Sequence, residues 1–184
     1  MSRMRKVIPT QSGLSLLLIA EAFGIALLFF SSETAQWITQ AIFFIVSMVI
    51  IWYASHPLSH YFFARSCGVG VLFFYLGRSE MSHGGITIAK KLSPLLLTIG
   101  TKLDQSKLKL VSPNRRAWIY GSGALTGVFV IALIESFAIL YTRYSLVALV
   151  LGGLFFIFTL VSEFFLSTKS GDLAKMKSQY PKAR

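Results

Sequence analysis

The sequence predicts an all-α polytopic membrane protein of four transmembrane helices, with a small β-hairpin or sheet inserted between the second and the third. Three observations predict this fold class. The 184 residues are 54% hydrophobic and only 14% charged, whereas soluble domains are usually about a quarter charged. Four stretches are apolar over the ~20 residues that a helix needs to cross about 30 Å of hydrocarbon. The positive charges gather in the segments on one side of these stretches.

The four apolar stretches belong to one membrane domain, as the length of the chain predicts. They are residues 13–31, 35–64, 117–141 and 145–166. The first stretch follows a cluster of basic residues, as the apolar core of a signal peptide does. Its apolar core is long for a signal peptide, and no small-residue cleavage site follows it, so we expect it to remain as a membrane anchor.

The charge distribution predicts the orientation. All of the 18 Lys and Arg residues except Arg143 lie in the N-terminal segment, in residues 65–116 or in residues 167–184. Basic loops stay on the cytoplasmic side, so we expect both termini in the cytoplasm. A net charge of +11 on a polar surface would indicate a nucleic-acid partner. Here the cations flank apolar runs, and anionic lipid headgroups are the expected partner, with the basic tail at 167–184 against them.

Residues 65–116 predict a cytoplasmic-side β and interfacial insertion. Its strand-like runs, rich in β-branched residues or alternating in polarity, are residues 69–76, 86–88 and 107–110. Gly84 and Gly85 indicate a turn between the first two runs. Residues 92–103 are amphipathic and flanked by lysines, and we expect them to lie in the membrane interface.

His56 and His60 stand four residues apart near the inner end of the second stretch. On a helix this spacing places both imidazoles on one face. A histidine at membrane depth is costly and usually marks a function. The alternative is a pair of interfacial histidines that hydrogen-bond to neighbouring helices, and the spacing alone does not decide between the two roles.

The residues from His56 onward, HPLSHYFFARSCGVGVLFFYLG, resemble the active-site segment of the site-2 protease family, the intramembrane zinc metallopeptidases. The family pattern is His-Glu-x-x-His, then an aromatic residue, Ala-Arg and Gly-Val-x-Val-x-x-Phe. The matching positions are His56, Leu58, His60, Tyr61, Ala64, Arg65, Gly68, Val69, Val71, Phe74, Leu76 and Gly77. Residues 112–129 resemble the start of the family's next core helix, where Gly123 and Gly127 form a G-x-x-x-G packing motif.

This resemblance implies a zinc ion held by His56, His60 and an aspartate that ends the third core helix of the family. The acidic residue in that place is Asp172. The asparagine, prolines and glycine that surround the family's aspartate are absent here. The alternative role of Asp172 is the N-cap of a short basic tail helix.

Pro57 occupies the position of the family's catalytic glutamate. Proline can neither take a proton from a metal-bound water nor deliver it, and loss of a general base costs about 10²–10⁴-fold in rate. We also expect Pro57 to bend its helix. Glu163, near the inner end of the fourth stretch, is the candidate substitute base. For Glu21 and Glu135, within the first and third stretches, we expect hydrogen bonds between helices.

Three functions follow from these observations. The favoured one is a site-2-protease-like membrane protein that is impaired in hydrolysis, optionally holds zinc, and binds membrane partners or substrate helices, with residues 69–76 pairing with an extended segment. The second is a working metallopeptidase with Glu163 as its base. The third is a small accessory subunit of a larger membrane complex, without metal. His83 is expected to be a solvated loop residue, and Cys67 a small packed one.

Overall fold

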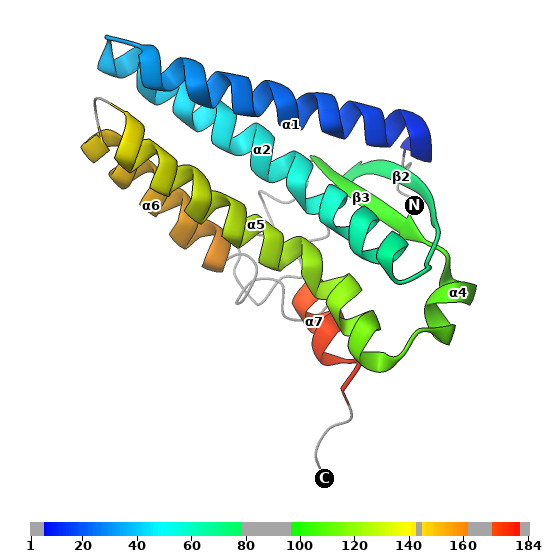
Figure 1. Cartoon of the computed structure of the whole chain (residues 1–184). Helices are drawn as coiled ribbons and strands as arrows, with labels where there is room; N and C mark the ends of the chain where they lie inside the picture. The colour runs from blue at the N-terminus through cyan, green and yellow to red at the C-terminus, as the bar shows by residue number, and fades with distance from the viewer. Residues whose placement is uncertain (1–5, 79–96, 143–144, 162–170, 181–184) are drawn as a thin grey trace.

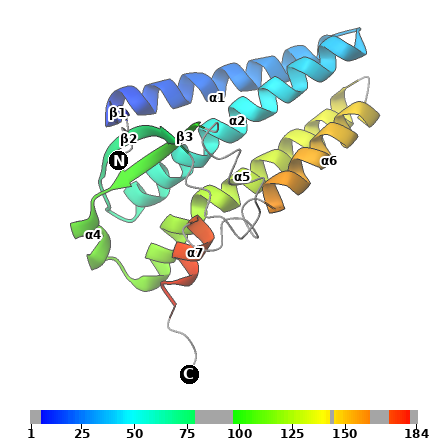
Figure 2. The same cartoon turned by 180° about the vertical axis from the view of Figure 1, so that it is seen from behind.

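The computed structural model describes residues 6–78, 97–142, 145–161 and 171–180 (Figure 1). Most of these residues are helical. The four long helices are α1 (Thr10–Glu33), α2 (Trp37–Ser66), α5 (Pro113–Tyr141) and α6 (Ser145–Val161). They lie in a row in which α1 packs on α2, α2 on α5 and α5 on α6, and the same order is seen from behind (Figure 2).

Three of these helices, α1, α2 and α5, are long and apolar enough to cross a membrane. Their outer faces expose large apolar side chains: Ile19 is 68% exposed, Phe129 62% and Leu140 74%. Such faces are unfavourable in water and suit a hydrocarbon solvent. The shorter apolar helix α6 covers the first part of the predicted fourth stretch, whose residues 162–166 lie outside the described residues.

Close packing between the helices depends on small residues at the contacts. A Cβ atom on Gly24 of α1 would lie 2.6 Å from Cγ1 of Ile51 on α2, so glycine lets the two backbones approach. Between α2 and α5 the core is built from fully buried apolar side chains, with Met48 1% and Ile131 0% exposed.

A three-stranded antiparallel sheet, in the order β1-β2-β3, lies beside α1 and α2, where α1 begins and α2 ends. Its strands are β1 (Lys6–Pro9), β2 (Val71–Arg78) and β3 (Leu97–Leu103). Gly68, with φ of +76°, turns the chain from the end of α2 towards β2. Phe74, on the central strand, is completely buried and packs with Leu17 of α1 and Leu58 of α2. These contacts fix the sheet against the end of α2 that carries the histidine pair.

The insertion differs from the sequence-based prediction in several places. Residues 97–103, part of the amphipathic segment expected at the interface, form β3. β1 was not predicted at all. Because β2 is paired on both sides, it has no free edge, and the prediction that residues 69–76 receive an extended partner is wrong. The predicted run 86–88, its Gly84-Gly85 turn and His83 lie outside the described residues.

Residues 107–110 were predicted to be strand-like and instead belong to the helix α4 (Gln105–Leu110). A cap explains the difference. The Asp104 carboxylate accepts hydrogen bonds from the backbone N–H groups of Ser106 (3.0 Å) and Lys107 (3.4 Å), which starts the helix. The hydroxyl of Ser106, with these backbone groups, holds the pKa of Asp104 below its ordinary value.

Candidate metal centre

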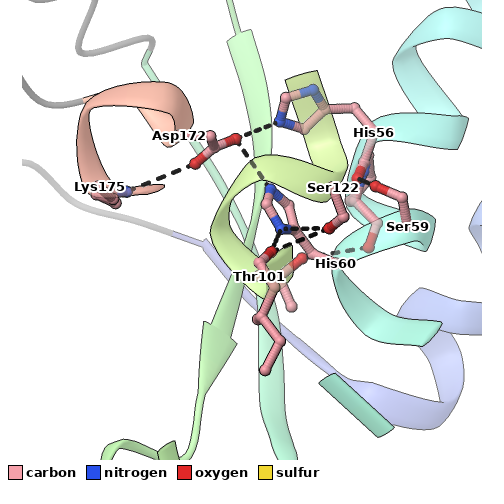
Figure 3. A network of polar contacts seen from close by, with 9 residues as sticks. His56, Ser59, His60, Thr101, Ser122, Asp172 and Lys175 are labelled. Carbon is pink, nitrogen blue, oxygen red and sulfur yellow. Dashed lines mark hydrogen bonds and ion pairs between the residues drawn. The ribbon is translucent and has the colours of Figure 1, made fainter. Parts of the chain in front are cut away.

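The histidine pair projects from the C-terminal half of α2, one helical turn apart, with ring centroids separated by 5.2 Å. Asp172 is the first residue of the short helix α7 (Asp172–Lys177). Its Oδ2 atom lies 2.9 Å from Nε2 of His56 and 2.9 Å from Nε2 of His60 (Figure 3). The structure thus brings together the three candidate ligands, although Asp172 is 112 residues from the nearer histidine in sequence. The N-cap of α7 is Gly171, so the alternative role of Asp172 as an N-cap is wrong.

The spacing of the three side chains suits a small metal ion. Their ligand atoms all lie within 4.8 Å of one another. Four ligands at about 2.0–2.1 Å around zinc are roughly 3.3 Å apart when tetrahedral. The two nitrogen–oxygen distances of 2.9 Å need only a slight opening to reach that value.

The orientation of His60 supports a cation between it and Asp172. Nδ1 of His60 lies 2.8 Å from the carbonyl oxygen of Ile119, which can only accept, so Nδ1 carries the hydrogen. Ser122 Oγ is 3.3 Å from the same nitrogen and donates to the same carbonyl. In a neutral ring Nε2 then presents a lone pair to the Asp172 carboxylate. Two acceptors at this distance require a cation or a proton between them, and a hydrogen-bonded Nδ1–H is the usual partner arrangement of metal-ligating histidines.

Gly123 of α5 leaves the space between the imidazoles open. A Cβ atom at this position would lie 2.6 Å from Nε2 of His56 and would also collide with Nε2 of His60. Both nitrogens therefore face a volume that any side chain at position 123 would fill. Gly127, the other glycine of the G-x-x-x-G motif, instead lies against Trp52, whose Nε1 would be 3.0 Å from a Cβ. Only the first of the two glycines borders the candidate site.

The centre is largely enclosed, with side-chain exposures of 26% for His56, 12% for His60 and 17% for Asp172. Burial raises the pKa of Asp172. When the rings are protonated, the His60 charge and the hydrogen bonds that both histidines then donate are larger in sum, and they hold the pKa of Asp172 well below its ordinary value. Lys175 Nζ lies 3.7 Å from the second carboxylate oxygen, Oδ1. Asp172 is therefore a carboxylate, which is the form that binds metal.

Position 57 offers no acid–base group to this centre. Pro57 is buried within α2, which remains one helix through it. Its carbonyl oxygen accepts a long hydrogen bond, 3.5 Å, from Thr101 Oγ1 of β3. Ser59 Oγ donates to the carbonyl oxygen of His56 over 2.7 Å and so is used within its own helix.

Of the glutamates named from the sequence, the two that the structure describes do not join the three ligands. Glu21 Oε1 accepts a hydrogen bond of 2.8 Å from Ser55, which joins α1 to α2 as expected for an interhelical carboxyl. Glu135 packs on α6, where a Cβ on Gly152 would lie 3.1 Å from its Cγ. Glu163 lies outside the described residues.

Two groups beside the centre were not predicted from the sequence. The i,i+3 spacing of Lys175 from Asp172 on a helix could have indicated their ion pair. The carbonyl of Ile119, a backbone group, leaves no signal in the sequence.

The centre is of the two-histidine, one-carboxylate kind, in a helical protein with three helices of membrane-spanning length. No protein-family model, curated protein or solved structure matches this chain.

Proposed function

We propose that this chain is a four-span integral membrane protein with a site-2-protease-like core, which binds a zinc-class ion at His56, His60 and Asp172 and acts on membrane partners by binding rather than by hydrolysis. The observation that supports it most is the convergence of one carboxylate oxygen on two imidazole nitrogens across more than 100 residues of sequence. Both termini are cytoplasmic in this proposal, in line with the basic segments at the inner ends of the spans.

The depth of the centre supports a place at the inner edge of the bilayer. Ser122 precedes the end of α5 at Tyr141 by 19 residues, which corresponds to about 29 Å of helix and to the thickness of the hydrocarbon. Trp118, one turn further in, is 50% exposed, as tryptophans at a membrane boundary often are.

The neighbours of the centre support binding over turnover. Zinc, when bound to three protein ligands, supplies Lewis-acid polarisation at a remaining position. Ile119 and Ser122 orient His60, and Lys175 faces the second oxygen of Asp172. Pro57 can accept no proton, so within the described residues the family's base position contributes no proton transfer.

Metal analysis of the purified chain in detergent or nanodiscs tests the proposal. The wild type should carry a single zinc ion per chain, and a His56→Gln/His60→Gln double variant should carry none. Glu21→Gln is a matched control because it also changes a polar side chain on the bundle but leaves the three ligands in place. Equal zinc in the wild type and the double variant, or no zinc in either, would refute the metal site. An ion-free chain that co-purifies with a membrane complex would favour the accessory-subunit function.

The hydrolytic part is tested separately with a transmembrane reporter helix. We expect no cleavage by the zinc-loaded wild type. Cleavage that disappears in Glu163→Gln would show a working peptidase with a substitute base.

A further inference from the structure

The helix that supplies Asp172 is too short to hold its own shape. α7 has six residues, and an isolated helix of that length is unstable in water. Its position therefore depends on what it contacts. Leu173 is only 9% exposed, and the sulfur of Met176 lies against Gly121 of α5. Lys175, by contrast, is 51% exposed.

These apolar contacts pack α7 against α5, and Asp172 reaches across to α2. Its Oδ2 atom faces Nε2 of both histidines, and in neutral His60 that nitrogen is an acceptor. Without a cation or a proton between them, the Asp172 carboxylate and Nε2 of neutral His60 face each other as two acceptors, which opposes docking. With an ion between them, the same three groups hold α7 to α2.

We propose that the ion acts as a clamp, so that metal loading decides whether the segment 171–180 is docked on the bundle or released from it. The inference rests on the proposed metal site and assigns it a regulatory role. Binding of the ion and docking of α7 are then linked: an ion that favours the docked state is itself bound more tightly when α7 is docked. Lys175 and Lys177, which are exposed on α7, move with the helix when it docks or is released.

Limited trypsin digestion of the full chain in nanodiscs, followed by mass spectrometry, tests this clamp. Lys175 and Lys177 lie inside α7, and their peptide bonds are cut only when the helix opens. At about pH 8, where free imidazole is neutral, zinc at 100 times its Kd should slow these cuts about 100-fold relative to chelated protein. The matched control is internal, because Lys107 and Lys109 lie in α4, another six-residue helix, which supplies none of the three ligands. Their cleavage rates should not change with zinc.

The variant His56→Gln removes one ligand from α2 and leaves the sequence of α7 intact. We expect zinc to give it no protection, so that α7 is cut at the rate of the chelated wild type. Wild type that binds a stoichiometric ion but is cut at Lys175 equally fast with and without it would overturn the clamp and leave the proposed metal site standing. Absence of bound zinc would overturn both.

Discussion

Gly123→Ala should strongly weaken metal binding while it keeps all three ligands. The new Cβ would lie 2.6 Å from Nε2 of His56 and closer still to Nε2 of His60, and an ordinary contact needs about 3.4 Å, so the groups must separate by at least about 0.8 Å. Metal–ligand distances tolerate about 0.2 Å. We therefore expect the affinity for zinc to fall by about 100-fold or more. Mutation of the groups that support metal ligands lowers metal affinity by up to about 100-fold.

The same change has a calculable effect on stability. Zinc at 100 times the wild-type Kd stabilises the folded chain by about 2.7 kcal/mol, and after a 100-fold loss of affinity the same zinc adds only about 0.4 kcal/mol. Without metal, steric overlap at Gly123 costs about 1–3 kcal/mol. The higher helix propensity of alanine offsets about 1 kcal/mol of that cost.

Calorimetric zinc titration and thermal unfolding with and without zinc measure both effects. The control is Gly153→Ala on α6, where a Cβ would meet nothing nearer than Oε1 of Glu135 at 3.6 Å. That variant should bind zinc like the wild type. Should Gly123→Ala bind zinc with wild-type affinity, the ion does not lie between the two imidazoles.

Three further predictions concern the scaffold. Gly24→Val should destabilise the α1–α2 contact by about 1–3 kcal/mol, as overpacking does, measured by unfolding of the purified chain; unchanged stability would contradict the close approach of these helices. The hydroxyl of Ser106, and then amides of the first turn of α4, lower the pKa of Asp104. The stabilisation of α4 by this carboxylate is therefore complete above about pH 3.8, and it is lost as the pH falls through the lower pKa of the folded state. Hydrogen exchange in α4 should thus be faster in Asp104→Ala than in wild type at pH 5, with the difference vanishing at strongly acidic pH. In a Cys67→Ser background, an impermeant maleimide should label Thr34→Cys on intact cells and Lys109→Cys only after lysis; the reverse pattern would invert the proposed orientation.

The long helices could be predicted because their signal is local. Apolar runs of membrane-spanning length form helices in any surroundings that lack water, so composition alone located α1, α2 and α5. The histidine pair could be predicted equally well, because a spacing of four residues places two side chains on the same face of a helix. Asp172 came only from the family resemblance, because no local pattern connects it with residues more than 100 positions earlier.

The strands escaped prediction because their stability comes from distant partners. β1 has four residues, and its pairing of Val7 with Tyr75 joins segments that are far apart in the chain. β3 reads as an amphipathic interfacial segment until β2 lies beside it and binds its backbone groups. For α4 the signal was present in Asp104, but the alternation of Lys107 to Leu110 outweighed it.

The wide separation of the ligands in the sequence has a consequence for biosynthesis. The histidines of α2 are synthesised more than 100 residues before Asp172, and in that interval the two imidazoles already lie beside each other without the carboxylate. A pair of neutral nitrogens retains zinc weakly, and the added carboxylate raises that affinity. If the proposed site binds zinc, tight metal uptake becomes possible only after α7 has joined the bundle, so a loaded ion would report that α7 is in place.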